Sequence, residues 1–420
     1  MRSLTLVFIF VIAIFASPET ASSQTVPGAQ NSCVNCHASA DDENLAQPVA
    51  KLKNDIHAQR GLSCVNCHGG DATADDMARA MDSRSGFVGA PTAKQIPAFC
   101  GKCHSNADTM KRFNPAIRVD QEIEYASSVH GKRNAQGDTS AATCVSCHGS
   151  HGITAIKDPN GPVYPTHVAE TCGRCHANAD YMKKYGIPTD QLQKYQTSVH
   201  ADALFKRHDL SAPTCNDCHG NHGAVPPGTA SVGNVCGTCH ARQSELFGKS
   251  RHKTAFDAMN LSECVACHSN HDVQHPTDEL IGTVSPAVCI TCHDKGEAGY
   301  ETAEFVYRRL AQLNERIASA DNILKRAARS GMEVSKASFD LNDARDSLTN
   351  ARVVLHTFLP DEVEKVIVPG EVISEKAQQA GENALRELLF RRQGLAVSLI
   401  VIAVAAASIY LKIRQIERKQ

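Results

Sequence analysis

The sequence predicts a mainly α-helical protein with extensive loops, and three observations support this fold class. Residues 30 to 295 are rich in Gly, Pro, Asn and Asp and show little apolar periodicity, which favours short helices and loops. From Glu301 onward, apolar residues recur at alternating spacings of three and four, which is typical of amphipathic helices. Residues 394 to 411 form an uncharged apolar run that is long enough to span a bilayer as a single transmembrane helix.

All 18 cysteines of the 420-residue chain fall in CxxCH motifs. In such a motif, the two thiols can add to the two vinyl groups of a haem, and the following histidine reaches the iron. A zinc site would use CxxC pairs without a histidine after each one, and a disulfide framework would need no histidine. The motifs therefore predict nine covalent c-type haems, each with its iron. They would be attached through Cys33, Cys36, Cys64, Cys67, Cys100, Cys103, Cys144, Cys147, Cys172, Cys175, Cys215, Cys218, Cys236, Cys239, Cys264, Cys267, Cys289 and Cys292. The predicted proximal iron ligands are His37, His68, His104, His148, His176, His219, His240, His268 and His293.

The N-terminus is consistent with covalent haem attachment after export. Arg2 precedes an apolar run from Leu4 to Ala16, and the polar stretch SPETASSQT follows it. This pattern predicts a secretory signal peptide over residues 1 to 23, because the apolar run is too short to cross a bilayer. The net charge of −2 and the lack of a basic cluster give no indication of a nucleic-acid partner.

The motifs repeat as pairs that begin at Cys64 and Cys100, Cys144 and Cys172, Cys215 and Cys236, and Cys264 and Cys289, with Cys33 alone in front. Second members usually read CGxCH, and longer fragments such as YASSVH and YQTSVH recur. Over residues 30 to 295 the chain resembles the periplasmic multihaem c-type cytochromes with doubled CxxCH motifs. The resemblance implies a haem-wrapped domain whose low-spin, bis-histidine haems lie in close contact and carry electrons.

Eleven histidines lie outside the motifs, and two groups of them repeat. One group follows a first-member motif by three residues, and the other precedes each pair. We predict that these seven are distal iron ligands, since a surface histidine would not be expected to recur at one repeat position. They are His151, His222 and His271 in the first group, and His57, His130, His200 and His252 in the second. His151 is too close in sequence to reach the far face of its own haem, so it should ligate a neighbouring one.

Two irons are then left without a distal ligand. The first pair lacks the histidine after its first motif, because Gly70 and Asp71 stand there. We predict His356 as the eighth distal ligand, with a polar-face histidine as the alternative. The ninth could be His167, His275 or His208, or that iron could be an open site.

Residues 300 to 392 predict an antiparallel helical hairpin with a turn at Gly331. Pro369 and Gly370 should end its second helix, and a third should run from about Glu375 into the apolar run. Simple helix packing is the favoured interpretation, with a docking arm or a homo-oligomer seam as alternatives. Basic residues in the tail at 412 to 420, together with the exported haem region, predict one C-terminal span of the cytoplasmic (inner) membrane. The haem domain would then lie in the periplasm.

The predicted function is electron transfer in respiration rather than catalysis. The haems would relay electrons between a quinol-oxidising or cytochrome b-type membrane subunit and periplasmic cytochromes or reductases. The alternative is a multihaem reductase for nitrite, hydroxylamine or a sulfur compound, which needs one open-site haem. No catalytic residue is predicted, and all nine motifs keep their histidine.

Overall fold

The computed structural model describes residues 31 to 227 and 232 to 418, and this part of the chain contains helices and no strands. The predicted mainly helical fold is confirmed. The predicted signal peptide lies outside the described residues. The chain divides into two compact units, Met1–His167 and Val168–Gln420, and each is described by itself.

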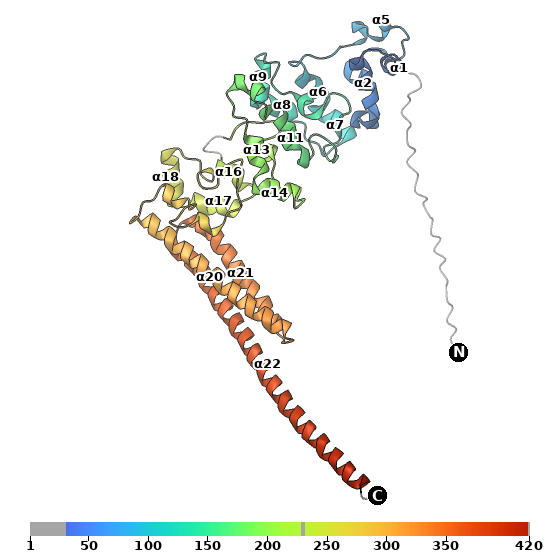
Figure 1. The fold of residues 1–420 in the computed structure, drawn as a ribbon. Helices are drawn as coiled ribbons and strands as arrows, with labels where there is room; N and C mark the ends of the chain where they lie inside the picture. The colour runs from blue at the N-terminus through green and yellow to red at the C-terminus, as the bar shows by residue number, and fades with distance from the viewer. Residues whose placement is uncertain (1–30, 228–231, 419–420) are drawn as a thin grey trace, which may run out of the picture. The chain divides into compact units, whose positions relative to one another are not determined.

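The first unit consists of short helices joined by loops (Figure 1). Its helices are α1 (Ser32–Ala38), α2 (Glu43–Lys51), η2 (Leu52–Asn54), α3 (Ile56–Gln59), α4 (Cys64–His68), α5 (Met77–Ala80), η3 (Ser83–Ser85), α6 (Ile96–His104), α7 (Ala107–Phe113), α8 (Gln121–Ser127), α9 (Val129–Ala135) and α10 (Cys144–His148). Helix α11 (Pro165–His176) begins in this unit and continues into the second.

The second unit begins with helices of the same short kind. They are α12 (Ala179–Met182), η4 (Lys183–Tyr185), α13 (Gln191–Gln196), α14 (Val199–Phe205), α15 (Cys215–His219), α16 (Val232–Gly237), α17 (Ala241–Gly248), α18 (Arg251–Met259), α19 (Val265–His268), η6 (Asp278–Leu280) and η7 (Cys289–Thr291). Three long helices follow, with a short 3₁₀ turn between the second and the third. These are α20 (Ala298–Arg329), α21 (Ser335–Val354), η8 (Leu355–Thr357) and α22 (Pro360–Glu417).

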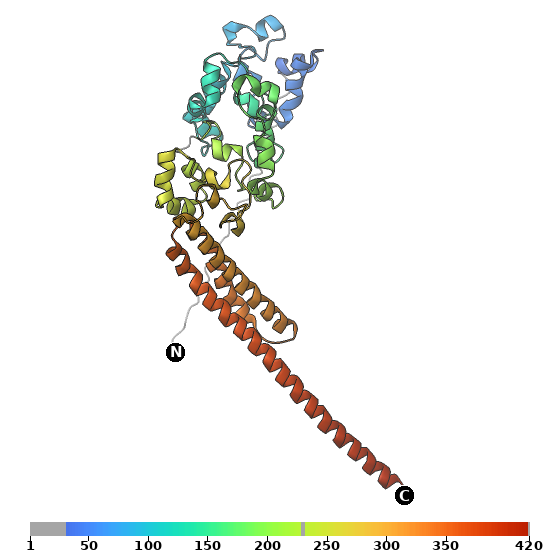
Figure 2. The ribbon, with the colours of Figure 1, turned by 60° about the vertical axis from the view of Figure 1, so that its left-hand side comes forward.

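Helices α20, α21 and α22 form a three-helix bundle, and they run side by side in both ribbon views (Figures 1 and 2). The apolar positions that the sequence pattern identified, among them Leu310, Leu313 and Leu341, are fully buried in its core. Gly331, with φ of +80°, makes the predicted turn between α20 and α21. Arg309 of α20 adds paired hydrogen bonds to Glu364 and Glu371 of α22, at 2.8 to 3.0 Å.

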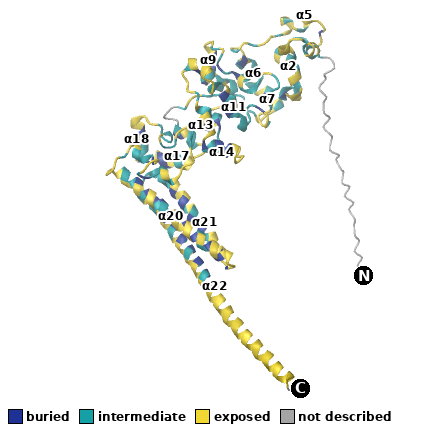
Figure 3. Cartoon of the chain, viewed as in Figure 1, coloured by how far each residue is buried: buried dark blue, intermediate teal, exposed yellow. Residues whose placement is uncertain are grey.

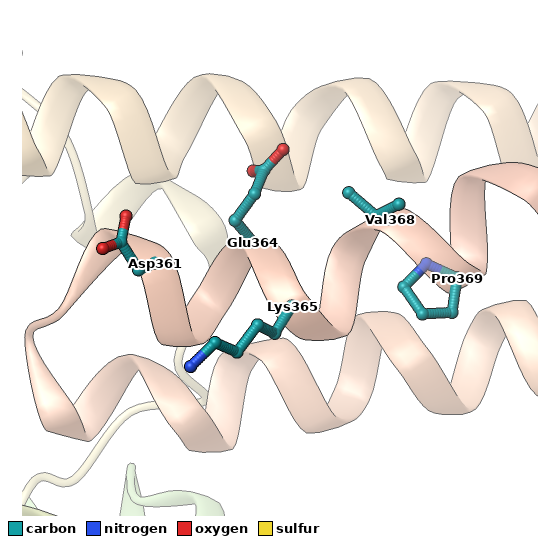
Figure 4. A pocket seen from close by; sticks show the side chains of 5 residues that line it. All are labelled: Asp361, Glu364, Lys365, Val368 and Pro369. Carbon is teal, nitrogen blue, oxygen red and sulfur yellow. The ribbon is translucent and has the colours of Figure 1, made fainter.

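The predicted break at Pro369 and Gly370 is wrong, because both residues lie inside the continuous helix α22. Pro369 is exposed and lies with Asp361, Glu364, Lys365 and Val368 along a surface groove (Figure 4). Gly370 is buried instead: a Cβ there would lie 2.8 Å from Ser347 Cβ and 3.2 Å from Leu313 Cδ1. Glycine is therefore used for close helix packing, and the core contacts of α22 outweigh the hydrogen bond that proline removes.

Beyond the bundle, α22 continues alone, and its residues there are exposed (Figure 3). This exposed part contains the predicted apolar run of residues 394 to 411. Within the described residues, α22 is the one helix long and apolar enough to cross a membrane. One continuous helix therefore covers both the end of the bundle and the apolar run.

Candidate haem-binding site

The first-member motifs form one-turn helices whose ends are fixed by their own sequence. At α4, α10 and α15 a Ser or Thr stands just before the first cysteine, and the third residue of the helix completes a capping box with it. The residue after the motif histidine has positive φ in all four pairs, at Gly69, Gly149, Gly220 and Ser269. Glycine favours this conformation, so the chain turns sharply there and the loop leaves the motif.

The second-member motifs at Cys100 and Cys172 end longer helices, and each has a glycine between its cysteines that packs closely against a neighbour. At Gly101 of α6, a Cβ would lie 1.9 Å from the Glu122 carboxylate. At Gly173 of α11, it would lie 2.5 Å from Leu192. The CGxCH form of these motifs therefore reflects close packing against the neighbouring helix.

The histidines that precede each pair lie in the first turn of a short helix. Ser128, Ser198 and Ser250 cap these helices, and each side chain accepts a hydrogen bond from a backbone N–H three residues on. The repeated tyrosine ties the region to the next motif. Tyr125 Oη donates to the Ala142 carbonyl at 2.9 Å, and Tyr195 Oη donates to the Pro213 carbonyl at 3.0 Å. The tyrosine of the YxxSVH repeat thus holds the histidine-bearing helix close to the start of the following motif.

Ring spacing tests whether histidine pairs fit an iron between them. A metal–imidazole bond of about 2 Å, with each ring centre roughly 1.1 Å behind its nitrogen, puts the two ring centres about 6 Å apart. Six motif histidines each face a non-motif histidine, with ring centres 5.9 to 6.5 Å apart. The residues present therefore fit haem irons with two imidazole ligands.

Histidines of first-member motifs face a ring that comes from later in the chain. His68 faces His151 at 6.1 Å, and His219 faces His271 at 5.9 Å. Each partner belongs to the loop after the first motif of the next pair. The last pair has no successor, and its His268 faces His356 of the bundle at 6.3 Å. The interplanar angles of these three ring pairs are 13° to 22°.

Histidines of second-member motifs face a ring that comes from earlier in the chain. His104 faces His57, His240 faces His200, and His293 faces His252. Each partner is the histidine that precedes the same pair of motifs. Their rings are strongly inclined to each other, at 82°, 44° and 81°. The repeat thus builds two kinds of ligand pair that differ in origin and in ring orientation.

Hydrogen bonds at Nδ1 hold four of these rings so that Nε2 is available for a metal. The Nδ1–H of His68, His219 and His356 donates to the carbonyl of Val88, Val225 and Val353, respectively, at 2.9 to 3.3 Å. His57 donates to the buried Asp55 carboxylate at 3.2 Å. Such partners fix the tautomer and increase the basicity of a ligating imidazole.

His252 is held differently. Its Nδ1 is buried and has no hydrogen-bond partner among the described residues. Its ring instead packs against Phe358, with ring centres 3.8 Å apart, and against Phe256. Phe358 follows His356 by two residues, so one turn of the bundle contacts two different ligand pairs. Sequence reasoning missed Phe358 and Asp55, because neither carries a repeat signal.

Burial favours the neutral, metal-binding form of the distal imidazoles. It lowers the pKa of His151, His200, His252, His271 and His356 as the largest cause in each case. A neutral ring keeps a lone pair at Nε2 for the iron.

The thiols show that consecutive motifs are neighbours within each unit. The Cys100 thiol lies beside the Cys144 thiol, and the Cys236 thiol lies beside the Cys264 thiol. Burial, followed by the neighbouring Cys33, raises the pKa of Cys64. No group of three His, Cys, Asp or Glu side chains in the described residues is arranged to hold a lone metal ion.

The remaining predicted ligands differ in whether a second histidine ring lies opposite them among the described residues. His37 has no second histidine ring opposite it among the described residues. His130, His148, His176 and His222 stay predictions from the sequence repeat. His167 donates from Nδ1 to the Gly161 carbonyl at 2.9 Å, and neither it nor His208 or His275 faces another described histidine ring.

Comparisons with known proteins agree with this site. A family model described as the doubled CXXCH motif matches residues 258 to 298, and one for cytochrome c554 and c-prime matches residues 16 to 69. The chain is 24% identical over 295 residues to the multiheme cytochrome MtrA of Shewanella baltica. The matched region covers 61% of this chain and 81% of that protein. It is 21% identical over 212 residues to the C-type polyheme cytochrome OmcC of Geobacter sulfurreducens. That matched region covers 44% of this chain and 25% of that protein. No solved structure matches significantly. The motifs, the imidazole pairs and these similarities support a multihaem c-type cytochrome.

Proposed function

We propose that the chain carries electrons through nine covalently attached haems. The observation that carries this proposal is the set of six imidazole pairs at bis-histidine spacing. Two protein ligands on an iron leave no coordination position for a substrate, so such sites suit electron transfer rather than bond chemistry. Bound haem would supply one-electron chemistry, and the chain sets its properties through ligand basicity and burial.

Contact between consecutive motifs supports a relay. The neighbouring thiols of Cys100 and Cys144, and of Cys236 and Cys264, belong to different pairs. Within pairs, Cys67 lies near Cys103 and Cys267 lies near Cys289. Attachment points that touch in this way bring successive haems together, so electrons could pass from motif to motif along each unit.

We further propose that α22 anchors the protein in the cytoplasmic membrane, with the haem domain in the periplasm. The apolar part of α22 is exposed over residues 394 to 411, and basic residues follow it. Bundle helices would then hold the last motifs near the membrane end of the chain. A quinol-oxidising or cytochrome b-type subunit could deliver electrons there, and periplasmic cytochromes or reductases could accept them.

The relay is tested with full-length protein purified from membranes after haem maturation. Mass measurement should give nine haems per chain, and optical redox titration should give one electron for each. Rapid mixing of the reduced protein with an oxidised soluble cytochrome c should transfer these electrons. Fewer haems, or no transfer to the acceptor, would contradict the proposal.

The anchor is tested by two truncations. A chain ending at Arg392 should release haem protein into the soluble fraction, whereas a chain ending at Leu411 should stay in the membrane. Membrane retention of the shorter chain would show that another segment anchors the protein.

A further inference from the structure

The motif at Cys33 stands alone, and its position in the first unit is that of a second member. Cys33 lies beside Cys64, the first cysteine of the next motif. The second members at Cys100 and Cys236 have the same relation to Cys144 and Cys264. No CxxCH motif stands between residue 1 and Cys33. The two patterns of ligand pairing found in the other motifs can each be applied to this one.

By the rule for second members, the distal histidine should precede the motif in the chain, as His57 precedes Cys64 and Cys100. Residues 1 to 32 contain no histidine. Residues 1 to 32 therefore supply no imidazole to this iron.

By the rule for first members, the distal histidine should stand three residues after the next motif histidine, His68. That position is Asp71. The loop does come to the lone motif, because the Ser32 N–H and Oγ–H both donate to the Ala72 carbonyl at 2.9 Å. Asp71 accepts hydrogen bonds from the N–H and Oγ–H of Thr73 at 2.9 and 2.6 Å. The repeat position is thus present beside Cys33, with a carboxylate in place of an imidazole.

The His37 ring is held through Nδ1 in the same way as the motif rings of His68 and His219. Its Nδ1–H donates to the Leu45 carbonyl at 3.3 Å, which leaves Nε2 for an iron. All 20 histidines lie in the described residues, and none of their rings faces that of His37. This motif therefore differs from the six whose partner ring is in place.

We propose that the iron at Cys33, Cys36 and His37 has one protein ligand and binds a small neutral nitrogen donor on its other face. This inference rests on the haem loading of the proposed function. Neutral ligands are favoured over anions because Asp71 lies in the loop bound to Ser32, and Asp42 caps α2, whose Leu45 holds His37. Carboxylates near a site repel anions at short range.

Low-temperature EPR of the oxidised full-length protein, with imidazole as the probe, tests the site. We expect one high-spin iron per nine haems, and added imidazole should convert that signal to low-spin. Nine haems with no high-spin signal would overturn the inference and leave the relay intact. A haem count of eight with an unmodified first motif would overturn both, so the two failures can be told apart.

Paired variants assign the signal to its motif. The double change Cys33→Ala and Cys36→Ala should remove the high-spin signal. The control double change Cys289→Ala and Cys292→Ala should remove a low-spin haem and leave the high-spin signal unchanged. A high-spin signal that survives the first change would place the site elsewhere. In His167→Ala the number of high-spin irons should stay at one. If the wild-type protein shows no high-spin signal and the His167→Ala variant does, His167 is the ninth ligand and the inference is wrong.

The ligand class is tested separately with Asp71→Asn, which removes the charge and keeps an oxygen for Thr73. Azide should bind this variant several-fold more tightly than the wild-type protein, while imidazole affinity stays the same. Equal azide affinities would contradict the preference for neutral ligands. The imidazole titration of the unmodified protein remains decisive for the site if any variant fails to fold.

Discussion

The helical bundle and the motif-bearing part of the same unit are stabilised in different ways. In the bundle, 17 buried apolar residues form one continuous cluster along α20, α21 and α22. The motif-bearing part has only clusters of three, and Leu204 is its one large apolar side chain without exposure among the described residues. A region with so little apolar burial cannot offset its conformational entropy alone. We therefore expect the bundle to fold on its own core and the motif region to depend on bound haem.

The largest expected effect comes from withholding haem. We expect a chain expressed without its signal segment, in cells that cannot attach haem, to keep a folded bundle and lose the fold of residues 32 to 297. Limited proteolysis should leave a fragment of about residues 298 to 388, and circular dichroism should report helix from that fragment. Protein matured with haem is the control under the same protease. Protected fragments from the motif region of the haem-free chain would show that this region folds without haem and would contradict the prediction.

The second prediction concerns the bundle core. Leu313→Ala removes a fully buried side chain that contacts Gly370 across the bundle. We expect the free energy of unfolding of the bundle to fall by about 2–5 kcal/mol in denaturant titrations. Val372→Ala, on the same bundle but 46% exposed, should change it by less than about 0.5 kcal/mol. Equal effects of the two changes would show that the bundle is not held by this core.

The third prediction concerns the one distal histidine that the bundle supplies. His356→Ala should convert the iron held by His268 from low to high spin, because its second imidazole is lost. The EPR signal should grow by one high-spin iron, with the haem count and the bundle's unfolding unchanged. His208→Ala, at an exposed residue that faces no described histidine ring, is the matched control. An unchanged spectrum for His356→Ala would remove the bundle from the ligand set.

The smallest expected effect separates rings that differ in their Nδ1 partner. Asp55 accepts a hydrogen bond from His57, whereas His252 has no acceptor. A charged acceptor makes the imidazole a stronger donor and so stabilises oxidised iron. Asp55→Asn should therefore shift one reduction potential to more positive values in a redox titration and leave haem content unchanged. The exposed Asp75→Asn should shift none, and a negative shift for Asp55→Asn would contradict the argument.

Several parts of the site could be predicted because they depend on local chemistry. The CxxCH spacing sets haem attachment within five residues, and the YxxSVH repeat builds its own capped helix. The apolar spacing from Val306 to Leu324 also predicted the buried face of α20. By contrast, Pro369 was expected to end a helix, and the packing of α22 against two partners overrode that local preference.

The sequence by itself predicted the haem chemistry, the proximal ligands and the candidate set of distal histidines, since covalent attachment and repeats are properties of short segments. Only the tertiary structure decided which ring faces which. His68 and His151 are 83 positions apart, and His268 and His356 are 88 apart. Such pairs form where distant segments dock, as when Ile56 N–H donates to the Ile153 carbonyl beside His57 and His151. Docking depends on packing and on backbone hydrogen bonds between remote loops, and no short segment encodes these contacts.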